Sequence, residues 1–170
     1  QAARLTDDLS VRFAAVVHDL GKALTPADML PRHHGHEERG VPLVRALCER
    51  LRVPRDYREL AEVVARYHLI CHRAGELRPS TLLRLLEVTD AFRRPERFER
   101  FLLACEADAR GRAGLEDRVY DQPVRLRAAL EAAHGVDAGA LAREGLVGPA
   151  IAAALRERRI KAIRAGLADA

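Results

Sequence analysis

A histidine followed directly by an aspartate, His18-Asp19, ends a short apolar run, FAAVVHDLGK. An apolar run is expected to be buried, and a buried imidazole and carboxylate both need partners. A divalent metal ion satisfies both, because imidazole nitrogen and carboxylate oxygen together suit first-row ions. The alternative is a structural His-Asp pair without a metal.

Further histidines follow in a predicted loop at residues 23–35, which contains Pro26 and Pro31 and little periodicity. Near a metal, such histidines can act as extra ligands, as proton donors or as phosphate contacts. The alternative is a solvated histidine-rich loop. The basic side chains of this cluster are Arg32, His33, His34 and His36, of which we expect His33 to be a surface residue.

His68 and His72 are four residues apart in an apolar-periodic segment, so they share one face of a predicted helix. This spacing suits two ligands of one ion, or one ligand and one substrate contact. A histidine pair in the core or at an interface is the alternative.

Two other groups of charged residues could contribute to a site. Asp90 follows an apolar helical turn and needs a cation, for which Arg93 or Arg94 could serve. Arg110 and Arg112 flank a glycine and could grip a phosphate, or could be cations at a helix C-terminus.

Helices are expected to position these side chains. A polar turn offers N-caps for the helix that delivers His18-Asp19, namely Thr6, Asp7, Asp8 and Ser10. Gly21 is interpreted as the C′ residue that ends this helix. Pro54, Pro79 and Pro95 suit the first turns of later helices. Beyond residue 114 the chain is rich in alanine and arginine, and amphipathic helices are predicted at 124–133 and 149–167.

The motif HDLGK with these histidines resembles the HD-domain superfamily of metal-dependent phosphohydrolases. More specifically, most of residues 4–112 resembles the C-terminal half of bacterial CCA-adding enzymes, which are tRNA nucleotidyltransferases. Several segments in the same order support this resemblance: VRFAAVVHDLGKALTP, PRHHGHEERG, LCERLRVP, ARYHLICH, LLEVTDAFRRPERFE and ACEADARGR.

The resemblance implies an all-α HD-domain helical bundle at 1–112, with a helical C-terminal extension at 113–170. It implies His18, Asp19 and Asp90 as ligands of a divalent ion, which could be nickel, magnesium, manganese or cobalt. In these enzymes the first metal-binding histidine would stand upstream of Gln1, so reduced metal affinity and impaired activity are expected. The other implied roles are catalytic for Lys22, His34, His36 and His68, and substrate-binding for Arg32, His72, Arg110 and Arg112.

Composition limits the function classes. With 29 basic and 25 acidic residues, the net charge of +4 permits only weak attraction to RNA or phosphate. Aromatic residues make up 4% and tryptophan is absent, which argues against base-stacking platforms. Cys48, Cys71 and Cys105 form no C-x-x-C, so we expect buried free thiols in a reducing compartment, the cytoplasm. No apolar run is long enough to cross a membrane.

The function implied by the resemblance is 2′,3′-cyclic phosphodiesterase, 2′-nucleotidase and phosphatase activity, linked to repair of tRNA 3′ ends. The expected substrates are 2′,3′-cyclic nucleotides or phosphate monoesters, with tRNA as a partner of the full-length enzyme; a homodimer is an open alternative. A different class of function is a non-catalytic helical tail that supports tRNA binding or subunit contacts. Hydrolysis of nucleoside triphosphates or alarmones is a third hypothesis.

Overall fold

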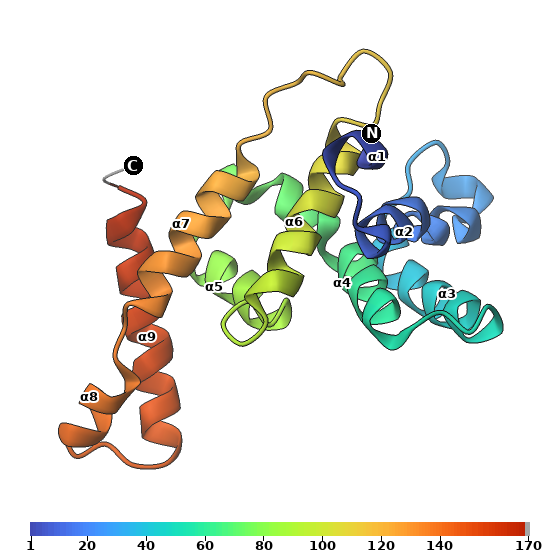
Figure 1. Ribbon diagram of the computed structural model, residues 1–170. Helices are drawn as coiled ribbons and strands as arrows, with labels where there is room; N and C mark the ends of the chain where they lie inside the picture. Colours follow the sequence, from blue (N-terminus) through green and yellow to red (C-terminus); the bar gives the residue numbers. More distant parts are fainter. Residues whose placement is uncertain (169–170) are drawn as a thin grey trace. The chain divides into compact units, whose positions relative to one another are not determined.

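The computed structural model describes residues 1–168 and consists of helices joined by turns and loops (Figure 1). Within these residues no β-strand occurs, so the predicted all-α fold is confirmed. Positions 169 and 170 of the predicted extension lie outside the described residues. The helices, with η for 3-10 segments, are α1 (Ala2–Leu5), α2 (Leu9–Val17), η1 (Leu20–Leu24), η2 (Ala27–Met29), α3 (His36–Arg50), α4 (Arg55–His72), η3 (Ala74–Glu76), α5 (Pro79–Val88), α6 (Pro95–Ala109), α7 (Gln122–His134), α8 (Ala138–Arg143) and α9 (Pro149–Gly166).

The chain divides into two compact units, and each is built from two stretches of sequence. Unit 1 comprises residues 1–72 and 96–120, and unit 2 comprises residues 73–95 together with the chain from residue 121 onward. Because a compact unit is not necessarily an independently folding domain, the predicted boundary between residues 112 and 113 stays a prediction. His18, Asp19 and the histidines near them all belong to unit 1.

The core of unit 1 forms where α2 and α3 pack against α4. Each helix contributes apolar residues spaced three or four apart, which is the spacing of one helical face. The side chain of Asp8, one of the four N-cap candidates in the sequence, caps α2 by accepting from the backbone N–H of Ser10 at 2.8 Å. The buried residues of these helices include Val11, Ala14, Val17, Val44, Cys48, Leu60, Ala61 and Val64.

A glycine contact joins the segment after α2 to the beginning of α3. A Cβ atom on Gly21 would lie 1.9 Å from the carbonyl oxygen of His36 and 2.6 Å from the backbone nitrogen of Gly40. The interpretation of Gly21 as the residue that ends α2 is therefore wrong: α2 ends at Val17, and Gly21 lies within η1. Its missing side chain lets two backbone segments touch, which brings Asp19 close to His36.

Unit 2 contains α5, α7, α8 and α9, with contacts of α7 and α9 to each other and to α5. Pro79 and Pro149 occupy the first positions of α5 and α9, where a missing N–H costs nothing. The core residues of this unit include Leu82, Leu86, Leu126, Ala129, Leu141 and Ile163. The sequence-based helices at 124–133 and 149–167 thus correspond closely to α7 and α9.

The three cysteines are buried and free, as the sequence suggested. None of the described helices is both long enough and apolar enough to cross a membrane.

Candidate metal centre

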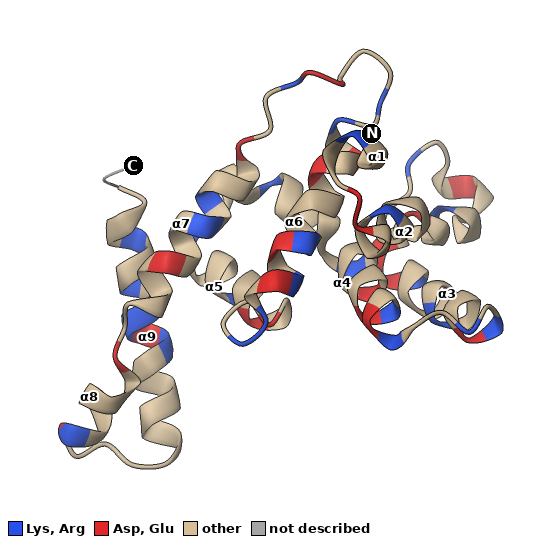
Figure 2. Cartoon of the chain, in the orientation of Figure 1, with Lys and Arg blue, Asp and Glu red and all other residues tan. Residues whose placement is uncertain are grey.

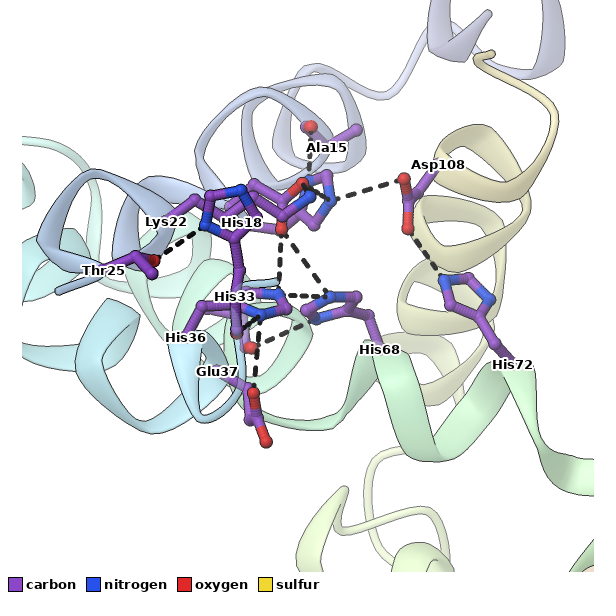
Figure 3. Close-up of polar contacts among 12 residues, drawn as sticks. Ala15, His18, Lys22, Thr25, His33, His36, Glu37, His68, His72 and Asp108 are labelled. Atoms are coloured by element: carbon purple, nitrogen blue, oxygen red, sulfur yellow. Dashed lines mark hydrogen bonds and ion pairs between the residues drawn. The ribbon is translucent and has the colours of Figure 1, made fainter. Parts of the chain in front are cut away.

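Five side chains from four parts of unit 1 form two overlapping groups of possible metal ligands, which share His68 (Figure 3). His18 and Asp19 follow α2 directly, His36 is the first residue of α3, His68 lies in α4 and Asp108 lies near the end of α6. The three histidines are between 1% and 7% exposed. This degree of burial means that their polar atoms must find partners within the protein or from a bound ion.

Each buried histidine donates its Nδ1–H to a backbone carbonyl of its own chain segment. The acceptors are Ala15 O at 2.8 Å for His18, His33 O at 2.7 Å for His36, and Val64 O at 3.0 Å for His68. A carbonyl can only accept, so Nδ1 carries the proton and Nε2 is the atom available to a ligand. All three Nε2 atoms face the centre of the site, an arrangement typical of metal-binding histidines.

The Nε2 atoms of His36 and His68 lie 3.3 Å apart, and Asp19 Oδ1 lies 3.1 Å from the first and 3.8 Å from the second. These are the separations expected for neighbouring ligand atoms about 2.1 Å from one ion. Without a cation, two unprotonated nitrogens and a carboxylate oxygen would repel one another.

Two buried atoms of the site have no hydrogen-bond partner among the described residues: His18 Nε2 and Asp19 Oδ1. Buried polar atoms are nearly always satisfied, so both are candidates for bonds to an ion. His18 Nε2 lies 3.2 Å from Asp19 Oδ2 and 3.4 Å from Asp108 Oδ1. The residues present therefore fit a divalent ion held by imidazole and carboxylate groups.

The surroundings of His18 and His68 shift the pKa values of these two histidines in opposite directions. Burial lowers the pKa of His18, but the carboxylates of Asp108 and Asp19 outweigh it and raise the pKa to about 10. Burial and the charge on His18 lower the pKa of His68 to about 4. Burial raises the pKa values of Asp19 and Asp108, yet the imidazolium of His18, 3.2 Å from the first carboxylate and 3.4 Å from the second, holds both well below the usual range. At neutral pH His18 is therefore protonated, and its positive charge balances part of the negative charge of Asp19 and Asp108.

Comparison with known proteins agrees with this geometry. The model of the HD domain family matches residues 1–94, the stretch that contains His18, Asp19, His36 and His68. The chain belongs to the HD domain family. Membership implies a divalent metal ion and a hydrolase fold, and the site described above supplies histidine and aspartate ligands for such an ion.

Relatives of this HD domain chain include the Multifunctional CCA protein of Thioalkalivibrio sulfidiphilus, which is 60% identical over 164 residues. The Multifunctional CCA protein of Nitrosococcus oceani is 60% identical over 163 residues, and that of Alkalilimnicola ehrlichii is 59% identical over 165. The matches cover 96%, 96% and 97% of this chain, but only 40% of each relative. No solved structure matches the chain significantly.

Two predicted site residues of the HD domain, Lys22 and His34, lie beside the metal-ligand cluster. Lys22 forms an ion pair with Asp19 Oδ2. His34 is exposed and lines a hollow of about 230 Å³ together with His33, Gly35, His36, Glu37 and Leu69. Arg32 is exposed on the loop that precedes α3. His33, expected at the surface, is half-buried, and its Nδ1 lies 2.7 Å from the hydroxyl oxygen of Thr25.

Other predicted site residues have structural partners. Arg110 donates to Glu106 Oε1 at 2.6 Å and to Glu116 O at 2.8 Å, while Arg112 is exposed. Asp90 belongs to unit 2, where Arg93 donates to both of its carboxylate oxygens, at 2.7 and 3.1 Å. The role of Asp90 as a metal ligand accordingly stays a prediction.

Sequence reasoning missed Asp108. It lies within the segment EADARGR, of which only Arg110 and Arg112 were predicted to be site residues. A signal was available: Asp108 follows Cys105 by three residues and Ala104 by four, both fully buried, so it shares their face of α6. An acidic residue on the buried face of a helix calls for a cationic partner.

Proposed function

We propose that this chain is a metal-dependent phosphohydrolase domain with 2′,3′-cyclic phosphodiesterase, 2′-nucleotidase and phosphatase activities. The observation that carries the proposal is the pair of overlapping ligand groups, which together contain three Nε2 atoms and two carboxylates; two of these atoms are buried and have no hydrogen-bond partner among the described residues. Membership of the HD domain family and the resemblance to CCA-adding enzymes supply the reaction class. We further propose that the full-length protein acts on tRNA, as the resemblance to CCA-adding enzymes implies.

In this proposal, His18, Asp19, His36, His68 and Asp108 hold the divalent ion. Asp108 replaces Asp90 as the second carboxylate, because its Oδ1 faces His18 at 3.4 Å, whereas Asp90 is paired with Arg93. When bound, the ion acts as a Lewis acid toward the phosphate and lowers the pKa of a water molecule that attacks phosphorus. The backbone carbonyls that receive each Nδ1–H keep the three imidazoles oriented toward that ion.

Lys22 and His34 handle charge and protons on the substrate. The ammonium group of Lys22 lies at the edge of the cluster and is 38% exposed, so it can shift from Asp19 to a phosphoryl oxygen. His36 and His68 use both ring nitrogens within the cluster, which leaves His34 as the histidine able to protonate a leaving oxygen.

The hollow beside His36 provides room for the leaving group. Its volume of about 230 Å³ lies below the usual range of about 300–1,000 Å³ for small-molecule sites. It therefore suits a ribose or phosphate group better than a whole nucleotide. The exposed Arg32 precedes His33, a lining residue of the hollow, in the sequence, and we assign it a contact to a second phosphate.

The alternative function, a non-catalytic tail that binds tRNA, rests on the basic helix α9. Figure 2 shows repeated basic positions along this helix. Several of them have partners within unit 2: Arg156 pairs with Glu87, Arg158 pairs with Glu144, and the guanidinium of Arg159 lies 4.1 Å above the ring of Phe92. These contacts favour a structural role for the helix, so catalysis is the better-supported proposal.

Metal content and hydrolysis test the proposal together. We expect protein purified without chelator to contain near-stoichiometric divalent metal by mass spectrometry, and to hydrolyse 2′,3′-cyclic AMP with Mg²⁺, Mn²⁺, Co²⁺ or Ni²⁺ added. Asp19→Asn should abolish the metal-dependent rate, because it removes an oxygen ligand. Asp28→Asn, at an exposed aspartate of η2, is the matched control and should leave the rate unchanged. Full metal-dependent activity in Asp19→Asn would refute the proposal.

A further inference from the structure

His72 and Tyr120 form a hydrogen-bonded arm on the far side of Asp108 from His18. His72 Nε2 lies 2.7 Å from Asp108 Oδ2, and His72 Nδ1 lies 2.9 Å from the hydroxyl oxygen of Tyr120. Figure 3 shows Asp108 between His18 and His72. One carboxylate thus faces the cluster with Oδ1 and the arm with Oδ2.

The directions of these hydrogen bonds follow from the groups involved. An ionised carboxylate only accepts, so His72 Nε2 must carry a proton and donate it to Asp108. In the neutral imidazole, Nδ1 then accepts the proton of the Tyr120 hydroxyl. The thiol of Cys71 lies 3.5 Å from the same hydroxyl and can donate to its oxygen. A donor is therefore available for every acceptor in the arm.

The hydrogen bonds of the arm restrict the rotation of the Asp108 carboxylate. The carboxylate of an aspartate turns easily about its last side-chain bond, whose preferences are broad. With Oδ2 held by His72, Oδ1 is directed at His18 Nε2, and the orientation of His72 is in turn held by Tyr120. Asp108 is only 16% exposed, so water competes weakly with these partners.

We propose that His72 and Tyr120 are positioning residues that preorganise Asp108 as a metal ligand. The inference rests on the proposed metal site and deepens it. It also replaces the predicted substrate-binding role of His72, because both ring nitrogens of this histidine are engaged within the protein. Tyr120 lies outside the stretch matched by the HD domain family and is not among the site residues predicted from the sequence.

Titration with Co²⁺ tests the arm without relying on turnover, because its visible spectrum reports the coordination geometry. His72→Leu removes the donor to Asp108 and should weaken Co²⁺ binding about 10- to 100-fold, the usual effect of losing such a partner. His72→Gln, whose side-chain amide can still donate to Asp108, should restore most of the affinity. Tyr120→Phe should weaken binding about fivefold, which corresponds to one neutral hydrogen bond.

Tyr67→Phe, a change of the same kind on α4, is the matched control and should leave both affinity and spectrum unchanged. Thermal unfolding of each variant without metal checks that the fold persists. Unchanged affinity and spectrum in folded His72→Leu and Tyr120→Phe would overturn the positioning role. If the unmodified chain binds Co²⁺ but hydrolyses no phosphate ester, the proposed function fails while this inference stands.

Discussion

The two units differ in where their histidines and carboxylates gather. Unit 1 buries three histidines side by side with two ionised carboxylates, and among the described residues His18 Nε2 and Asp19 Oδ1 have no hydrogen-bond partner. Unit 2 pairs charges near its surface, as in Arg93 with Asp90 and Arg143 with Asp137. Exposed pairs of this kind contribute little to stability, whereas buried unsatisfied groups cost a great deal unless a ligand completes them. Both groups of possible metal ligands among the described residues lie in unit 1, and this observation favours unit 1 as the unit that carries the chemistry.

The largest expected effect concerns the backbone contact beneath the site. Gly21→Ala should lower the free energy of unfolding by about 3 kcal/mol or more, because its Cβ would overlap backbone atoms of α3. Gly40→Ala, on the other side of the contact, meets its nearest atom at 3.3 Å and should stay within about 1 kcal/mol of the unmodified chain. Urea denaturation measures both. Equal effects of the two variants would show that the close approach is not what holds these segments together.

Removal of a ligand should have the next largest effect. In the unmodified chain, Mn²⁺ at 100 times its Kd should stabilise the fold by about 2.7 kcal/mol, and a chelator should reverse this. His36→Ala should abolish the stabilisation, since it removes one of the three ligand atoms in the group formed by Asp19, His36 and His68. His134→Ala, at an exposed histidine of unit 2, should leave it intact. A metal-dependent shift of Tm that survives in His36→Ala would mean that the ion binds elsewhere.

Metal affinity should also depend on pH. Because the pKa of His18 is raised to about 10 in the metal-free protein, a proton must leave its Nε2 before an ion can bind. Affinity should therefore rise by about tenfold per pH unit between pH 6 and pH 8, with release of about one proton per ion. Calorimetry in buffers of different ionisation enthalpy measures that proton. A pH-independent affinity over this range would contradict the assigned protonation of His18.

The smallest effect is expected in unit 2. Arg156→Ala breaks the exposed ion pair with Glu87 and should change the free energy of unfolding by less than about 1 kcal/mol, with less effect at high salt. Metal binding should not change. A large loss of metal affinity in this variant would contradict the assignment of the chemistry to unit 1 alone.

Local patterns in the sequence predicted most of the fold. Prolines at helix starts and the cap at Asp8 act over one turn of helix, so Pro79 and Asp8 could be placed correctly from sequence. Gly21 was misinterpreted because its role depends on Gly40, a residue 19 positions away whose approach no local pattern reveals.

The short range of sequence patterns also limited the prediction of the candidate site. His18, Asp19, His36 and His68 were singled out by residue type, and the structure brings their ligand atoms together. Asp108 and Tyr120 escaped because their partners lie 36 or more positions away in sequence, and neither residue belongs to a local cluster of ligand types. Side-chain contacts between α6 and α4, such as Asp108 with His72 and Arg97 with Glu59, hold Asp108 at the site, and no short motif reveals them.

The discontinuity of unit 1 has a consequence for the order of events during synthesis. The chain leaves this unit after residue 72 and returns at residue 96, so the histidines are made before the aspartate that completes their site. At about 5–20 residues per second, Asp108 is added roughly 2–8 s after His68. An ion captured by the nascent chain in that interval would be held by an incomplete set of ligands, and tight retention would begin only once α6 had emerged from the ribosome and docked.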